Sequence, residues 1–161
     1  MSETQPQFIW RCFTDLSHSD LYDLLRLRQD VFLVEQQCLF PDMDGRDHAA
    51  IHLLVKGKDG LLLGCCRVLP PESEADCVAI GRFVVRENVR GQGLGHEMMR
   101  EAVKECASRF SGNAMLVRAQ SHLAGFYGHH GFRVSGKEYM EDGIPHIDLV
   151  RAVKSPGQKT E

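Results

Sequence analysis

The sequence lacks the features that define several classes of protein. It contains no apolar run long enough to span a membrane, and its N-terminus lacks the basic and apolar regions of a signal peptide. It also lacks an excess of basic residues, because its 161 residues carry a formal net charge of −3. We therefore expect a cytoplasmic protein with no membrane partner and no nucleic-acid partner.

Metal-binding and disulfide patterns are missing as well. The six cysteines include no CxxC pair, so we predict reduced cysteines that pack as small apolar side chains. Asp42 and Asp44 begin a stretch that is similar to a calcium loop. However, Gly45 stands at its fourth place, and Leu53 rather than a glutamate stands at its twelfth. No HExxH motif is present. We expect no metal cofactor.

What the sequence does contain is a glycine-rich turn between a strand and a helix. The apolar strand 80–85 leads to the turn 90–95, and a helix begins inside the glycine run and continues through residues 98–110. The first N–H groups of a helix have no helical partner, and the positive end of the helix dipole lies behind them. Glycines let such a backbone curl tightly and approach a ligand. The junction therefore predicts a receptor for phosphate or pyrophosphate.

Two common phosphate-binding motifs do not fit this turn. A dinucleotide-binding fingerprint requires GxGxxG after a first strand. Here the glycines are Gly91, Gly93 and Gly95, and three predicted strands precede the strand that leads to them. A P-loop requires Gly-Lys-Ser/Thr, whereas this chain has Gly95-His96-Glu97. The alternatives left are another phosphate-bearing ligand, or a helix entry whose glycines only allow close packing.

Periodicity and turn signals predict one α/β domain with a mixed sheet, in the order β-α-β-β-β-α-β-α-β-β. Ser17 or Ser19 is expected to cap the first helix, and Gly131 to end the last helix in the left-handed conformation. The nearly continuous apolar segment 114–119 predicts a strand that is buried on both faces. The domain is expected to span residues 8–153, between an N-terminal tail at 1–7 and a flexible C-terminal tail at 154–161. The predicted strands are 8–13, 52–56, 61–69, 78–85, 114–119, 132–139 and 146–153.

Two motifs in a fixed order connect the turn to a known family. The first is Arg90-x-x-Gly93-x-Gly95, and the second is Phe126-Tyr127 on a short helix before Gly131-Phe132. Together they resemble the two signatures of the GNAT N-acetyltransferases, and the resemblance extends over residues 8–153. The stretches 27–36, 44–47, 119–123 and 141–146 are similar to the ElaA-like branch of that family. The resemblance implies a single GNAT (acyl-CoA N-acyltransferase) domain, whose mostly antiparallel twisted sheet is flanked by helices.

The resemblance also implies acetyl-CoA as cosubstrate. Backbone groups of the strand before the turn would pair with the pantetheine arm, and N–H groups of the turn would hold the pyrophosphate with help from Arg90. A strand amide near Val85 would polarise the thioester carbonyl. Tyr127 would protonate the departing sulfur, because a tyrosine pKa of about 10 keeps the hydroxyl protonated at neutral pH. Gln120 departs from the family, in which many members carry asparagine. The implied cofactor-binding residues are Phe83, Val84, Val85, Arg90, Gly91, Gln92, Gly93, Leu94, Gly95, Gln120, His122 and Tyr127.

The acceptor implied by the resemblance is a primary amine of an unidentified small molecule or peptide, which attacks the acetyl group directly. An amine arrives protonated, so a base or a water relay has to remove a proton before the attack. Glu35, at the end of the first helix, is the first candidate for this base, with a structural hydrogen bond as the alternative. His146 has the better intrinsic pKa and is the second candidate.

Several alternatives stay open at this point. The chain could be a catalytically silent acyl-CoA-binding module that acts through a partner, or a transferase for a longer acyl chain. It could be a monomer or a homodimer. The acidic loop that contains Asp42 and Asp44 could favour a cationic acceptor or could simply be solvated. His52 is predicted to be a core histidine, and His129 and His130 to form a solvated helix end.

Overall fold

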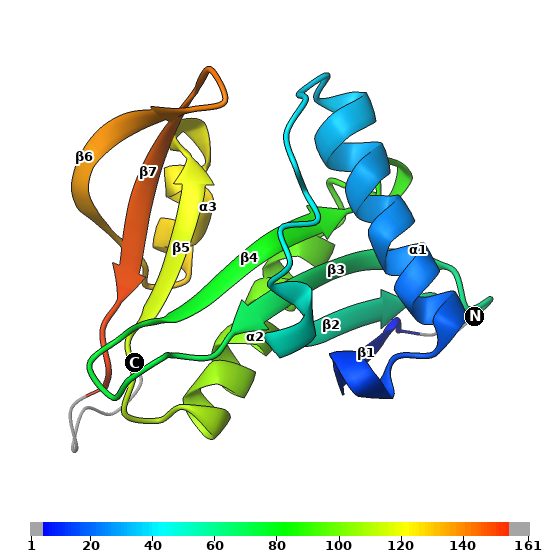
Figure 1. The fold of residues 1–161 in the computed structure, drawn as a ribbon, viewed down its shortest axis with the longest axis horizontal. Coiled ribbons are helices and arrows are strands. Elements are labelled where there is room, and N and C mark those ends of the chain that lie inside the picture. Colours follow the sequence, from blue (N-terminus) through cyan, green and yellow to red (C-terminus); the bar gives the residue numbers. More distant parts are fainter. Residues whose placement is uncertain (1–4, 155–161) are drawn as a thin grey trace.

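The computed structural model describes residues 5–154, which form one seven-stranded sheet with helices on its faces (Figure 1). The strands are β1 (Gln7–Cys12), β2 (Ile51–Lys56), β3 (Leu62–Leu69), β4 (Val78–Val85), β5 (Met115–Gln120), β6 (Arg133–Glu141) and β7 (Ile144–Arg151), in the order β1-β2-β3-β4-β5-β7-β6. All neighbouring strands are antiparallel except β4 and β5. The predicted α/β domain with a mixed, mostly antiparallel sheet is confirmed. Residues 1–4 and 155–161 of the two predicted tails lie outside the described residues.

Three α-helices and five shorter helical segments connect the strands. Ser17 caps the first helix, as expected, because its side chain accepts a hydrogen bond of 3.0 Å from the Asp20 N–H. Gly131 has a φ of +85° just after the last helix, which agrees with its predicted left-handed conformation. The helices are α1 (His18–Arg28), α2 (Leu94–Arg109) and α3 (Ala124–His129), and the shorter segments are η1 (Phe13–Asp15), η2 (Gln29–Glu35), η3 (Asp47–Ala49), η4 (Glu87–Val89) and η5 (Ser121–Leu123).

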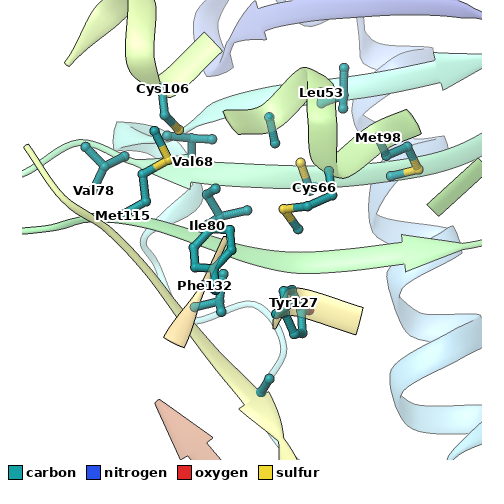
Figure 2. Packing of buried hydrophobic residues seen from close by; sticks show 14 of the residues in the cluster. Leu53, Cys66, Val68, Val78, Ile80, Met98, Cys106, Met115, Tyr127 and Phe132 are labelled. Atoms are coloured by element: carbon teal, nitrogen blue, oxygen red, sulfur yellow. The ribbon is translucent and has the colours of Figure 1, made fainter. Parts of the chain in front are cut away.

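Each face of the sheet has its own apolar core. On the face covered by α2 and α3, large side chains such as Met98, Tyr127 and Phe132 pack against Ile80 and Cys66 of the central strands (Figure 2). On the other face, the buried leucines of α1 pack against β2, β3 and β4. All six cysteines are free, as predicted, and three of them are buried. This arrangement holds β4 between two packed layers.

Two predictions about local structure are wrong. The segment around β5 is not buried on both faces, because its burial alternates and Arg118 is exposed. The reason is that α1 packs against β3 and β4 and leaves the same face of β5 uncovered (Figure 1). The first helix, which was expected to end at Glu35, also does not stay a regular α-helix to that residue. It widens at Gln29 into the π-helix η2, a rare geometry that often accompanies functional sites.

Among residues 5–154, no helix is long and apolar enough to cross a membrane. Within the same range, no group of three or more histidine, cysteine, aspartate or glutamate side chains is arranged to hold a metal ion.

Candidate active site

The central opening of the sheet lies between β4 and β5. These strands pair only at Val78 with Met115 and at Ala79 with Leu116, and beyond these pairs they diverge (Figure 1). The rest of β4, from Ile80 to Val85, therefore presents a backbone edge that β5 does not occupy. Unpaired strand edges can form hydrogen bonds with an extended partner. This edge contains the three strand residues that were predicted to bind the cofactor.

A bulge changes the direction of β4 at this edge. Cys65 pairs with Val84 and Arg67 pairs with Gly81, so two residues of β4 face Cys66 alone. Arg82, one of these two, has a φ of +48°, which is uncommon for a residue other than glycine. The ring of the second, Phe83, lies 5.9 Å from that of Phe126 on α3, so the bulged strand contacts the helix across the opening.

The glycine turn follows directly at the end of β4. Gly91 and Gly93 have φ values of +78° and +85°, and a side chain at either position would meet no atom within 4 Å. Both glycines are therefore needed for the backbone conformation and not for close packing, which argues against the alternative of a packed helix entry. The first hydrogen bond into α2 runs from the Glu97 N–H to the Gly93 carbonyl, at 3.1 Å. The preceding N–H groups of α2 are therefore available to an anion.

Arg90, in this turn, forms an ion pair with Glu35 at the end of η2. Both guanidinium Nη atoms of Arg90 donate to the Glu35 carboxylate, and its Nε donates to the Val85 carbonyl at 2.8 Å. Hydrogen bonding to Arg90 lowers the pKa of Glu35. The pair joins the predicted pyrophosphate residue to the predicted base, and it makes the Glu35 carboxylate a weaker proton acceptor.

Tyr127 lies on α3 beneath the opening, with 8% of its surface exposed. Its ring packs edge-on against that of Phe126, at a centroid distance of 5.1 Å. It packs in the same way against Phe132, at 6.1 Å (Figure 2). Burial, followed by the neighbouring Cys66, raises the pKa of Tyr127 to about 12. The phenol therefore keeps its proton at neutral pH, which is the state that a general acid requires.

The end of η2 also reaches β5. The Gln120 amide nitrogen at the end of β5 lies 3.5 Å from the Gln36 side-chain oxygen, one residue after Glu35. The π-helix therefore touches both sides of the opening, through Glu35 on the β4 side and Gln36 on the β5 side. His122, the neighbouring candidate, is exposed on η5.

His146 lies on β7 beside the end of β5, where it pairs with Gln120. Its Nδ1 lies 2.8 Å from the Ile144 carbonyl, so this nitrogen carries the proton that is donated. Its ring stacks at 6.1 Å on that of Tyr139, and its Nε2 lies 3.7 Å from the exposed carboxylate of Glu141. In the neutral ring, Nε2 is therefore the nitrogen that can accept a proton.

Sequence reasoning missed a network of ion pairs, four of whose six members are buried. We call it the Arg–Asp cluster: Arg28, Asp42, Asp44, Asp47, Arg67 and Arg82. Arg28 donates to Asp42 at 2.9 Å and to Asp47 at 2.7 Å. Arg67 donates to Asp44 at 2.6 Å and to Asp47 at 3.1 Å. The Arg82 guanidinium lies 2.8 Å from an Asp42 oxygen, so the bulge in β4 is connected to the same cluster.

The cluster corrects the interpretation of the acidic loop. Asp42 and Asp47 are buried, and arginines neutralise them, so they neither form a solvated surface nor attract a cationic acceptor. Hydrogen bonding to Arg67 holds the pKa of Asp44 well below its usual range. The available signal was an arginine at an apolar position in each of two elements, Arg28 in α1 and Arg67 in β3. His52 is a buried core histidine, as expected, with its Nε2 at 2.9 Å from the Asp47 carbonyl.

Comparison with known proteins gives one consistent family. A family model described as "Acetyltransferase (GNAT) domain" matches residues 33–152. ElaA of Escherichia coli is 38% identical over 141 residues, which cover 87% of this chain and 92% of that protein. Its crystal structure superimposes with a TM-score of 0.86 at 35% identity, covering 92% of this chain and all of that chain.

Other solved structures agree. An acyl-CoA N-acyltransferase from Pseudomonas aeruginosa has a TM-score of 0.86 and 38% identity, again over 92% of this chain and all of that chain. A GNAT family acetyltransferase from Elizabethkingia anophelis, solved with acetyl-CoA bound, has a TM-score of 0.61 over 91% of this chain and 97% of that chain. That protein is 17% identical, so its similarity concerns the fold alone.

Proposed function

The chain belongs to the GNAT family of acetyltransferases, and from this premise we propose that it transfers an acetyl group from acetyl-CoA to a primary amine. The observation that carries the proposal is the open edge of β4, which leads directly into the glycine turn and lies above the buried phenol of Tyr127. The pantetheine arm of CoA, with a diphosphate at its end, matches these features in the order in which they lie. We expect the enzyme to act in the cytoplasm as a monomer or homodimer.

The proposed reaction is a direct transfer. The lone pair of the neutral amine attacks the thioester carbonyl carbon, and an N–H group of β4 near Val85 stabilises the negative charge that develops on the carbonyl oxygen. The carbon–sulfur bond then breaks, and the Tyr127 hydroxyl donates its proton to the departing sulfur. The products are an amide and free CoA. With a pKa of about 12, the phenol is protonated before the step and recovers its proton readily afterwards.

The proposal is tested by measuring CoA release from acetyl-CoA across amines, amino acids, aminoglycosides and peptides. Saturable release with at least one class of amine supports it. Clear CoA binding with no release on any acceptor contradicts it and favours the silent binding module. A parallel series with propionyl-CoA and butyryl-CoA tests the preference for acetyl over a longer chain.

Tyr127→Phe removes the acid and keeps the ring packing. We expect kcat to fall about 10²–10⁴-fold while the Kd for CoA stays within about twofold. Tyr22→Phe on α1, where the side chain is exposed, is the matched control and should leave kcat unchanged. Equal turnover of Tyr127→Phe and the wild type would remove Tyr127 from the acid role.

For the base, we propose His146 in preference to Glu35. The Glu35 carboxylate is engaged by Arg90, and its pKa is lowered, whereas Nε2 of His146 is free to accept a proton. His146→Gln should abolish the acidic limb of the pH profile of kcat/KM, and Glu35→Gln should retain it. The opposite result would assign the base to Glu35.

A further inference from the structure

Three imidazole rings lie together between α2 and α3, and we call this group the histidine cluster: His96, His129 and His130. His96 Nδ1 lies 2.8 Å from His130 Nε2, and the centroid of the His129 ring lies 5.1 Å from that of His96 and 5.3 Å from that of His130. Phe126 covers one side, with its ring at 4.8 Å from His96 and 5.3 Å from His130. His130 is half-buried, so the prediction of a solvated helix end fails for this residue.

The surroundings of the histidine cluster are basic. Arg100, one turn further along α2, and Arg151, at the end of β7, both act electrostatically on His130. Within residues 5–154, neither these two arginines nor the three histidines form an ion pair with a carboxylate. The Nε of Arg151 is buried without a hydrogen-bond partner. Within the described residues, no carboxylate therefore lies in ion-pair contact with the basic side chains of this region.

The missing negative charge affects protonation. The short contact between His96 and His130 needs one N–H and one lone pair, so the two facing nitrogens cannot both carry a proton. Burial lowers the pKa of His130 to about 4, and His96, His129, Arg100 and Arg151 contribute in the same direction. An anion beside these groups would raise the pKa of His130 electrostatically and favour a second proton on the His96–His130 pair.

The cluster lies next to the glycine turn. His96 directly follows Gly95, the last glycine of the turn, and a Cβ at Gly95 would be 3.7 Å from Phe126, whose ring covers the cluster. A ligand whose diphosphate occupies the turn would therefore have its adjoining groups within reach of α2, α3 and their histidines. CoA carries such an adjoining group, because its ribose bears a phosphate monoester in addition to the diphosphate. A phosphate monoester has a charge of about −1.5 to −2 at neutral pH.

We propose that His96, His130 and Arg100 form the binding site for the 3′-phosphate of CoA, and that binding is accompanied by proton uptake on the His96–His130 pair. This inference rests on the proposed function, since it assumes that CoA occupies the glycine turn. It adds a site that selects CoA against its dephosphorylated form. The charge-assisted contacts should also make the selection stronger at lower pH, as long as the phosphate keeps its second negative charge.

The test compares CoA with 3′-dephospho-CoA by isothermal titration calorimetry on the full chain at pH 6.5 and pH 8. For the wild type we expect CoA to bind about tenfold more tightly than 3′-dephospho-CoA at pH 6.5, and the ratio to shrink at pH 8. Repeating the titration in buffers of different ionisation enthalpy should show proton uptake with CoA and less with 3′-dephospho-CoA. His130→Gln should remove both the preference and the uptake, whereas His18→Gln, at an exposed histidine on α1, should remove neither.

Arg100→Gln provides a second variant at an exposed position, and it should reduce the preference without disturbing buried packing. Equal affinity of the wild type for the two ligands at both pH values overturns this inference and leaves the proposed function intact. Failure of both ligands to bind overturns the two proposals together.

Discussion

Two groups of ionisable side chains in this protein differ in whether partners of the opposite charge accompany them. In the Arg–Asp cluster, each carboxylate contacts at least one arginine. The arginines come from α1, β3 and β4, and the carboxylates come from the segment between η2 and β2. In the histidine cluster, the side chains are all basic, and within residues 5–154 none of them pairs with a carboxylate. Both groups lie close to the opening between β4 and β5, one connected to the bulge and the other beside the glycine turn.

The difference indicates what each group does. A buried charge is tolerated when its partner belongs to the chain, and removing one partner then exposes the full cost of burying the other. Such a group holds structure together, and here it connects the acidic loop to the bulge at Arg82. Basic groups that gather without an acidic partner disfavour one another's protonation in the free protein, which agrees with the lowered pKa of His130. A ligand that carries negative charge would remove this penalty. Stability measurements can therefore separate the two groups.

The largest expected effect is on the Arg–Asp cluster. Arg28→Ala leaves Asp42 without its 2.9 Å donor and removes the shorter contact to Asp47, so we expect the free energy of unfolding to fall by about 3–5 kcal/mol. Urea denaturation measures this. Arg26→Ala, two residues away on the same helix with its side chain 69% exposed, should change it by at most about 0.5 kcal/mol. Similar losses for the two variants would mean that the cluster does not stabilise the fold.

Acidification should affect the two groups in different pH ranges. The pKa of His130 is lowered to about 4 from 6.5, so below pH 6.5 the unfolded chain binds a proton that the folded chain does not, and stability falls as the pH falls. The pKa values of Asp44 and Asp47 are lowered from 3.8, so their stabilisation is present above that value and is lost as the pH falls further. Each group contributes at most about 1.4 kcal/mol per pH unit, and partly exposed His130 contributes less.

Denaturation curves at half-unit pH steps check this separation. His130→Gln should reduce the loss between pH 6.5 and 4 and keep the loss at lower pH. Part of the upper loss should stay, because burial lowers the pKa of His52 as well. Asp44→Asn should reduce only the loss of stability at the lower pH. If His130→Gln left the loss of stability between pH 6.5 and 4 unchanged, the histidine cluster would not contribute to that loss.

The smallest expected effect comes from Arg100→Gln. The Arg100 side chain is exposed, and within residues 5–154 it forms no ion pair with a carboxylate. We therefore expect the substitution to raise the free energy of unfolding by at most about 0.5 kcal/mol. The melting temperature without ligand measures this change. A loss above 1.5 kcal/mol would show that the cluster has a structural partner and would remove the contrast between the two groups.

Much of the fold could be predicted because local signals carry it. Ser17 caps α1 through its own side chain, and Gly131 adopts a positive φ that other residues avoid. The one-sided burial of β5 could not be predicted, because it depends on where α1 lies across the sheet. The same limit applies to η2, since no local residue pattern distinguishes its π-helical turn from a regular helix.

The site was predictable to a different degree at each position. The glycine turn is encoded locally, because Gly91 and Gly93 have positive φ values that glycine tolerates and most other residues avoid. Glu35 was chosen for its place at a helix end, but the structure adds that Arg90 holds it, over a separation of 55 residues. The roles of Tyr127, Glu35 and His146 stay predictions.

By itself, the sequence determined the order of elements, the glycine turn and the family. These depend on periodicity, glycine conformation and short motifs, which act between neighbouring residues. Only the tertiary structure decided which charges are balanced. Arg28 meets Asp42 and Asp47, and His96 meets His130, because the folded sheet brings distant segments together. Electrostatic energy depends on distance and burial, and neither can be read from a residue's place in the chain.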